Sequence, residues 1–177
     1  DVSAYIPTNV ISITDGQIFL ESSLFFSGMR PAVNVGLSVS RVGGDAQTKA
    51  MKKAAGSLRI DLAQYREMEV FTQFSSDLDD ATKEQLEYGS GLMELLKQPL
   101  GKPMSLADKV ITLCAARHKV MLGIPTAKVK GFQMDMLSYF ASAHPEIARE
   151  IEETKDLSKE LSQKIVEIAE EFKKSRC

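Results

Sequence analysis

Gly36-Leu37-Ser38-Val39-Ser40-Arg41-Val42-Gly43-Gly44 divides this 177-residue chain into two kinds of sequence. Up to the arginine, apolar residues alternate with small or polar ones, a period of two that is typical of a β-strand. After the two glycines, a helical pattern begins at about Asp45 and continues toward the end of the chain. The sequence therefore predicts a short β-rich segment followed by a mainly α-helical region.

The β-rich segment is expected to contain several strands. Residues 1–44 are rich in Gly, Pro, Ser, Asn and β-branched residues, which favours strands and turns. Thr14-Asp15-Gly16 predicts a turn between one strand at residues 10–13 and another at residues 17–20. Apolar residues alternate again over residues 33–39 and predict a further strand. We expect these strands to belong to a sheet that other residues cover on at least one face.

The helical region predicts five or six helices in series, joined by short loops, which describes a bundle. Ser105-Leu106-Ala107-Asp108 matches a capping box at the start of one helix. His144-Pro145 ends one helix and begins another. Apolar residues at helical spacing mark the buried faces: Ala54, Leu58, Leu62 and Tyr65; Leu106, Val110, Leu113 and Cys114; Val129, Phe132, Met136 and Phe140; and Leu157, Leu161, Ile165, Ile168 and Phe172. A further helix is predicted from Asp77 to Leu96, before the break at Pro99.

The composition excludes several classes of protein. Hydrophobic residues make up 44% and charged residues 26% of the chain, as in an ordinary globular protein with a core. The net charge of −2 argues against electrostatic binding to nucleic acid or anionic lipid. Cys114 and Cys177 make neither a disulfide framework nor a zinc motif, so a reducing, intracellular setting is expected.

The ends and the hydropathy of the chain give two further expectations. The sequence has no apolar run of the roughly 18–20 residues needed to span a bilayer, and no signal peptide. It opens on Asp1 rather than Met and begins directly in an apolar region. We therefore expect an excised fragment whose upstream part is missing.

Arg41 is the first candidate functional residue. An arginine at the end of a strand is permanently charged, and its planar donor fork suits phosphate oxygens. No G-x-x-x-x-G-K-[ST] motif occurs in the chain to hold a triphosphate. Arg41 is then either a charge donated to a phosphate in a neighbouring subunit, or a salt-bridged surface arginine. Ser38 and Ser40 are either hydrogen-bond donors near the same site or the polar face of a half-buried strand.

Other candidates carry weaker signals. Arg30-Pro31 lies in a turn before a strand and could face a ligand, and Gln98 at a helix end could bond an adenine edge. Each also has an ordinary structural explanation as a turn or helix-end residue. The acidic run at Asp77, Asp79 and Asp80 suits a helix N-terminus. It lacks EF-hand spacing and a neighbouring histidine, so no metal ligands are assigned.

The chain closely resembles the C-terminal portion of the α subunits of F-type ATP synthases of bacterial type. Residues 1–104 match strongly, whereas residues 105–177 match in helical pattern and length more than in identical stretches of sequence. The matching words are DVSAYIPTNVISITDGQI at 1–18, RPAVNVG at 30–36, SVSRVG at 38–43, LAQYRE at 62–67, SDLD at 76–79 and ELLKQ at 94–98.

This resemblance implies a domain division and a set of site residues. Residues 1–50 would be the last strands and a helix of a P-loop nucleotide-binding α/β domain, and residues 51–177 a helical bundle domain. Arg41 would match the arginine that the α subunit supplies in trans to the catalytic site of the β subunit. In the same catalytic group, Ser38 would match a position associated with activity and Ser12 a residue lining the interface site.

A second, non-catalytic nucleotide site is also implied. Arg30, Pro31 and Gln98 match positions near its adenine. The family often has a second glutamine two residues beyond Gln98, but Leu100 stands there in this chain. ATP or ADP with magnesium is expected in the full complex, and none bound to the fragment alone.

The resemblance finally implies partners and a location. The α subunit would alternate with β subunits in a ring around γ, joined by δ and peripheral-stalk subunits, for ATP synthesis or hydrolysis coupled to proton transport. The complex would lie peripherally at the cytoplasmic face of the bacterial plasma membrane, without nucleic acid. The alternatives are a non-enzymatic helical interaction module and a fragment of another hexameric P-loop motor ATPase.

Overall fold

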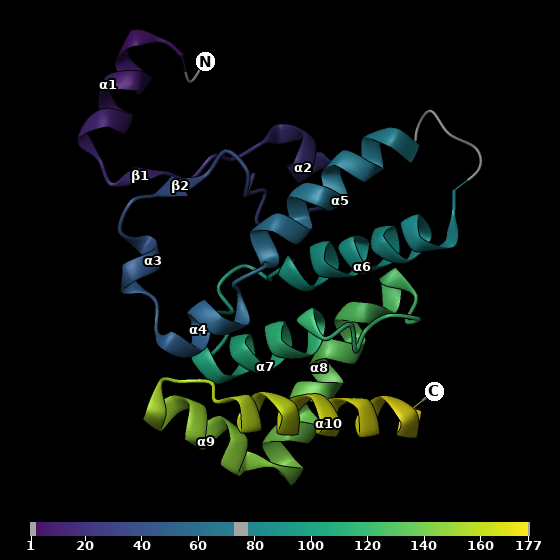
Figure 1. Cartoon of the computed structure of the whole chain (residues 1–177). Helices are drawn as coiled ribbons and strands as arrows, with labels where there is room; N and C mark the ends of the chain where they lie inside the picture. Colours follow the sequence, from purple (N-terminus) through teal and green to yellow (C-terminus); the bar gives the residue numbers. More distant parts are fainter. Residues whose placement is uncertain (1–2, 73–77, 177) are drawn as a thin grey trace. The chain divides into compact units, whose positions relative to one another are not determined.

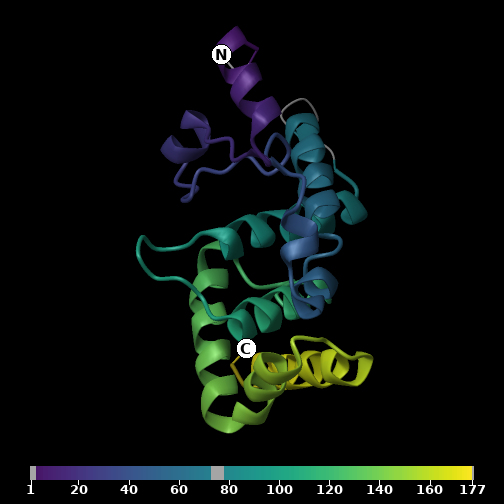
Figure 2. The same cartoon turned by 90° about the vertical axis from the view of Figure 1, so that its left-hand side faces the viewer.

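The chain is mainly helical, as the sequence predicts, in the computed structural model that describes residues 3–72 and 78–176 (Figures 1 and 2). The described residues contain one sheet, of two short strands. The chain divides into two compact units, Asp1–Gln47 (unit 1) and Thr48–Cys177 (unit 2). Each unit is built in a different way.

Unit 1 contains short elements joined by turns. In chain order these are α1 (Tyr5–Ile13), β1 (Gly16–Gln17), α2 (Ser22–Phe26), β2 (Val39–Ser40) and α3 (Gly43–Ala46). Strands β1 and β2 pair antiparallel, with Gly16 opposite Ser40 and Gln17 opposite Val39. A single bridge between Leu20 and Val33 extends the pairing of the two chain segments.

The strand predicted at residues 10–13 is wrong, because these residues form the second half of helix α1. A four-residue apolar run does not distinguish a strand from a helix by itself. Pro7 is the third residue of α1, where a backbone N–H would have no acceptor inside the helix, so proline is tolerated there. The hydroxyl of Thr8 adds a hydrogen bond to the Ala4 carbonyl at 2.8 Å. Residues 14–16 therefore join a helix to a strand.

The strand predicted over residues 33–39 forms only at its two ends. Val33 makes the isolated bridge and Val39 belongs to β2. Between them the side chain of Asn34 accepts hydrogen bonds from the backbone N–H groups of Gly36 and Leu37, at 3.0 and 3.1 Å. An asparagine side chain that bonds the backbone ahead of it forms a turn, which interrupts the strand.

Unit 1 exposes much of its apolar surface. Helix α1 buries none of its residues, and the buried residues among those described in the unit are Met29, Ala32 and Asn34. The most exposed large apolar side chains are Tyr5, Ile6, Ile13, Ile18 and Phe26, each more than 70% exposed. Hydrogen bonds, rather than an apolar core, therefore hold this unit together.

Unit 2 is a set of packed helices. They are α4 (Lys49–Ala54), α5 (Leu58–Thr72), α6 (Asp80–Leu96), α7 (Leu106–Arg117), α8 (Thr126–Ala143), α9 (Pro145–Thr154) and α10 (Lys159–Arg176). The predicted stripe from Ala54 to Tyr65 spans two helices, because the chain turns at Gly56 between α4 and α5. The predicted helix start at Asp77 lies outside the described residues.

Helix α7 lies at the centre of unit 2, where it packs against α4, α8, α9 and α10 (Figure 1). Of the predicted stripe, Val110 and Cys114 are buried, whereas Leu106 and Leu113 are half-buried. A helix that is contacted from several sides buries more than one stripe. Its buried residues are Ala107, Val110, Ile111, Thr112, Cys114, Ala115 and Ala116.

The predicted start of α7 is confirmed. The hydroxyl of Ser105 accepts the backbone N–H of Asp108 at 3.0 Å, as an N-cap does. A carboxylate oxygen of Glu152, from α9, accepts the N–H of Ala107 at 3.1 Å. Pro145 stands at the start of α9, also as predicted.

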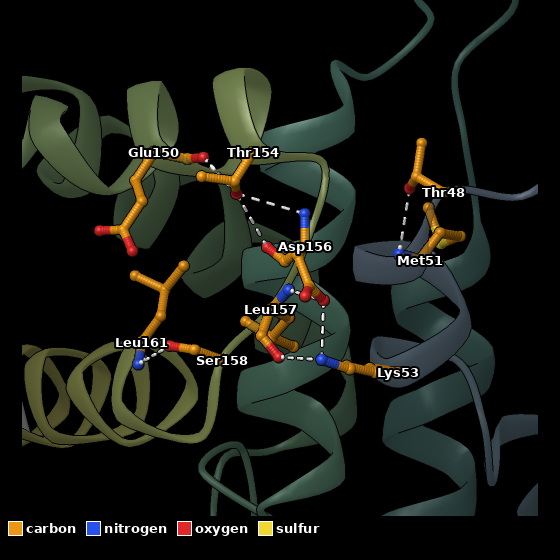
Figure 3. A network of polar contacts seen from close by, with 9 residues as sticks. All are labelled: Thr48, Met51, Lys53, Glu150, Thr154, Asp156, Leu157, Ser158 and Leu161. Atoms are coloured by element: carbon orange, nitrogen blue, oxygen red, sulfur yellow. Dashed lines mark hydrogen bonds and ion pairs between the residues drawn. The ribbon is translucent and has the colours of Figure 1, made fainter.

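Helix α4 is tied to the turn between α9 and α10, about a hundred residues later in the chain (Figure 3). The ammonium group of Lys53 donates to the Asp156 carboxylate at 2.7 Å and to the Leu157 carbonyl at 3.0 Å. The N–H of Ala50 donates to the Lys155 carbonyl at 2.9 Å. Arg117 of α7 donates to the Lys53 carbonyl at 2.7 Å. These contacts join the first helix of unit 2 to α7 and to the turn between its last two helices.

Two glycines of α6 predict opposite effects on stability. A Cβ on Gly89 would lie 2.3 Å from the Tyr65 ring, whereas one on Gly91 would meet nothing within 4 Å. We expect Gly89→Ala to lower the free energy of unfolding by about 1–3 kcal/mol through overpacking. Gly91→Ala should raise it by up to about 1 kcal/mol, because alanine favours the helix. Urea unfolding followed by circular dichroism measures both, and equal effects of the two changes would contradict this packing.

The contact of Lys53 with Asp156 predicts a pH-dependent contribution to stability. The hydrogen bond from Lys53 lowers the pKa of the Asp156 carboxyl below its usual range. Its contribution is then fully present above the pKa of an unfolded aspartate and is lost as the pH falls through the folded pKa. We expect Asp156→Asn to destabilise the chain at pH 7 and to match the parent chain at pH 2. Asp80→Asn, which removes a fully exposed carboxylate, is the control, and an equal pH dependence of the two variants would refute the assignment.

Candidate functional site

Arg41 follows directly after β2, and its exposed side chain reaches back to the end of α1. Its Nη1 donates to the Ser12 carbonyl at 3.4 Å and its Nη2 to the Ile11 carbonyl at 3.3 Å. Carbonyls of the last helical turn lack intrahelical partners and carry partial negative charge, so a cation is favoured there. Both distances are long for hydrogen bonds, and the guanidinium is therefore held weakly.

Asp15 fixes the backbone on both sides of Arg41. Its carbonyl accepts the N–H of Arg41 at 2.8 Å, and its carboxylate accepts the hydroxyl of Ser40 at 2.6 Å. The Ser40 hydroxyl in turn accepts the N–H of Gly43 at 2.8 Å. Residues 40–43, the arginine segment, are thus held in one conformation by side-chain and backbone hydrogen bonds, while the Arg41 side chain itself stays at the surface.

Gly16 allows the strand pair beside Arg41 to come close together. A Cβ at this position would lie 1.9 Å from the carbonyl oxygen of Val39. No other residue type fits such an approach without moving β2. Both residues of the Asp-Gly pair therefore help to position Arg41. Asp15 forms hydrogen bonds with residues 40 and 41, and Gly16 lets β2 lie against β1.

The three residues assigned to the catalytic group lie in one unit but differ in their contacts. Ser12 lies next to Arg41 through its carbonyl, and its hydroxyl donates to the Asn9 carbonyl at 2.7 Å. The hydroxyl of Ser38 donates to the Asn34 carbonyl at 2.6 Å and accepts the N–H of Phe19 at 3.0 Å. Ser38 therefore organises the turn before β2, while Ser12 contacts the arginine.

The residues assigned to the nucleotide base lie in different units. Arg30 and Pro31 belong to unit 1 and are joined by a cis peptide bond. The Arg30 guanidinium lies over the Phe25 ring, 4.5 Å from its centre. Gln98 belongs to unit 2, in the loop after α6, where its side-chain nitrogen donates to the Lys102 carbonyl at 3.0 Å. Leu100 is fully exposed in the same loop.

The sequence predicts only a turn at Asp15 and no functional role for Asn34. Both organise the arginine segment: Asp15 bonds Ser40 and Arg41, and Asn34 holds the loop before β2, with its own Nδ2 donating to Glu21 at 2.7 Å. Aspartate and asparagine in turns commonly bond nearby backbone, and this preference is a signal that could have singled them out. The partner of each bond could not be read from spacing alone.

The described residues show no group of three or more His, Cys, Asp or Glu side chains that could hold a metal ion. Among the described helices, none is long and apolar enough to cross a membrane. The functional group that the arginine segment presents is thus a surface guanidinium on a fixed backbone. Such a group can bind an anionic ligand that comes from outside the segment.

Comparison with known proteins gives matches over nearly the whole chain. Residues 47–172 match the family model "ATP synthase alpha/beta chain, C terminal domain" and residues 1–40 match "ATP synthase alpha/beta family, nucleotide-binding domain". The chain is 57% identical over 174 residues to an ATP synthase subunit alpha of Clostridium kluyveri and 58% identical over 173 residues to that of Acetivibrio thermocellus. Identity to the subunit alpha of Petrotoga mobilis is 54% over 172 residues.

These matches cover 97–98% of the chain, whereas the chain spans about a third, 34%, of the length of each of these relatives. The mainly helical fold agrees with the C-terminal domain that the first family model describes. The chain belongs to the ATP synthase α subunit family and corresponds to its C-terminal portion. The resemblance recognised in the sequence is thereby confirmed.

The bonds around Asp15 predict a local effect of its replacement. We expect Asp15→Ala to speed amide hydrogen exchange at Gly43 by about fivefold, as for loss of a hydrogen bond worth about 1 kcal/mol, because Ser40 loses its acceptor. Asp15→Asn keeps an acceptor oxygen and should exchange as the parent chain does. Exchange rates by NMR test this, and an unchanged Gly43 in the alanine variant would show that Asp15 does not hold the segment.

Proposed function

We propose that this part of the α subunit supplies Arg41 in trans to a catalytic site held mainly by the neighbouring β subunit. Two features support the proposal. The guanidinium is exposed, and its backbone is fixed by Asp15. The observation that carries most weight is that only two long hydrogen bonds to α1 carbonyls hold the guanidinium.

Weak hydrogen bonds of this kind suit an arginine that exchanges its carbonyl partners for a phosphate. In phosphoryl transfer, charge spreads over the oxygens of the transferring group, and an arginine placed there stabilises that charge. The guanidinium would leave two neutral carbonyls at 3.3–3.4 Å and gain charged phosphate oxygens, which accept stronger hydrogen bonds. ATP synthesis or hydrolysis would then proceed only when the interface between the subunits brings the phosphate to Arg41.

Ser12 and Ser38 would act through position. Ser12 presents the carbonyl on which the guanidinium rests, at the surface that would face the neighbouring subunit. Ser38 closes the turn that leads into β2, through its bonds to Asn34 and Phe19. Replacing either serine would displace the arginine segment without removing its charge.

The same subunit would hold a nucleotide without turning it over, and three of its residues would lie near the base. The amide nitrogen of Gln98 is bound to the Lys102 carbonyl, so the amide oxygen is left as an acceptor and fits the amino group of adenine. Arg30 and Pro31 are the other two residues that we propose near the base. ATP or ADP with magnesium would be the ligand in the full complex, and magnesium would supply charge neutralisation there.

The proposal extends to the assembly. Residues 1–50 would complete a nucleotide-binding domain and residues 51–177 would form the helical domain. The α subunit would alternate with β around γ, contact δ and the peripheral stalk, and lie with the complex at the cytoplasmic face of a bacterial plasma membrane. There ATP chemistry would be coupled to proton transport, so that the subunit takes part in hydrolase and translocase activity.

The role of Arg41 predicts a selective loss of turnover. In the assembled synthase carrying this α sequence, Arg41→Ala should lower steady-state ATP hydrolysis by about 10³–10⁵-fold while nucleotide binding persists. Arg41→Lys should remain strongly impaired, because lysine lacks the planar donor fork. Arg149→Ala, which removes an exposed arginine of α9, is the matched control. Turnover at the parent rate in Arg41→Ala would overturn the assignment.

A further inference from the structure

A cavity of about 150 Å³ opens between helices α5 and α6 of unit 2, and its lining contains none of the residues assigned to the sites above. A space of this size holds a molecule about as large as benzene, so it is too small for a nucleotide. Its walls come from three segments: Asp61, Gln64, Tyr65 and Met68 on α5, Gln85 and Tyr88 on α6, and Lys119 in the turn after α7. The close approach of the Tyr65 ring to Gly89 fixes one wall.

The hydroxyl groups of the two tyrosines in the wall already donate hydrogen bonds to carboxylates. The Tyr88 hydroxyl donates to an Asp61 oxygen at 3.1 Å, and the Tyr65 hydroxyl donates to Glu69 at 3.1 Å. A phenol has one hydrogen, so both hydroxyl oxygens can now only accept. The ammonium group of Lys119 is bound to Glu84 at 2.6 Å. That ammonium also lies 5.8 Å from the centre of the Tyr88 ring. The cavity therefore offers a ligand the two phenol oxygens and the Asp61 carboxylate as acceptors and the ring of Tyr65, beside the side-chain amides of Gln64 and Gln85.

The charges around the cavity favour a cation. Burial raises the pKa of Tyr65 to about 12, and the negative charge of Glu69 adds to the effect. Burial also raises the pKa of Tyr88; the negative charge of Asp61 contributes more to this than the positive charge of Arg117 opposes. Negative charge thus dominates at both hydroxyls, while Glu84 balances Lys119.

We propose that this cavity binds a guanidinium group, as carried by an arginine side chain of a partner polypeptide or by a small free guanidine. A guanidinium is planar and stacks on aromatic rings, and its five N–H donors match acceptors that lie in several directions. The Asp61 carboxylate can accept further hydrogen bonds beside the one from Tyr88. This site is independent of the role proposed for Arg41.

The test is an NMR titration of the full chain with N-acetyl-arginine amide, which carries one guanidinium and no other charge. The chain has four tyrosines and no tryptophan, so the tyrosine ring signals report directly on the cavity. We expect saturable shifts of the Tyr65 and Tyr88 rings, with Tyr5 and Tyr139 unmoved. N-acetyl-citrulline amide, which has the same size but no charge, should bind at least tenfold more weakly.

Two variants check the source of the binding. Asp61→Asn keeps an acceptor for the Tyr88 hydroxyl but removes the charge, and should weaken arginine binding at least tenfold while the circular dichroism spectrum stays the same. Lys119→Met removes the cation among the described wall residues and should strengthen binding. Equal shifts with citrulline, unaltered binding in Asp61→Asn, or shifts spread over all four tyrosines would each overturn the proposal. A free guanidine that binds as well as the amide would identify the small molecule, rather than a polypeptide, as a sufficient ligand.

Discussion

The burial of α7 on several sides is the constraint on which unit 2 depends. Seven of its twelve residues are buried, and three of these are alanines, which let neighbouring helices approach closely. The two polar or weakly polar members find partners: Thr112 accepts the side-chain nitrogen of Gln133 at 3.2 Å, and the Cys114 sulfur lies 3.2 Å from the Ser162 hydroxyl. Close packing of this kind does not accommodate larger side chains, so α7 fixes where α4, α8, α9 and α10 can lie.

Unit 1 is held together by hydrogen bonds rather than by a buried helix. Polar side chains do there what an apolar core does in unit 2: Asp15 joins two segments that lie 25 residues apart, and Asn34 closes the turn between them. Hydrogen bonds fix direction as well as distance, whereas apolar contacts are non-directional. A segment that must present one guanidinium in a defined place therefore gains from bonds to its own backbone, while the side chain remains able to change partner.

The sequence predicted the long helices well, because amphipathic spacing over many residues and capping residues such as Ser105 are local signals. It failed at residues 10–13, where four β-branched and polar residues are too few to distinguish a helix from a strand. Arg41 could be chosen by its residue type and place after a strand. Its contacts with the Ser12 carbonyl and with Asp15 could not be predicted, because they form through tertiary folding. The cavity lined by Tyr65 and Tyr88 could not be predicted from the sequence either, because it depends on how α5 packs against α6.

The exposed apolar side chains of unit 1 have a thermodynamic consequence. The heat-capacity change of unfolding scales with the apolar surface that becomes newly hydrated. Ile13 and Phe26 are each 84% exposed in the folded chain, so melting unit 1 adds little to that surface. Calorimetry of this chain therefore records the helices around α7, and the arginine segment can open and close almost without a heat-capacity signature.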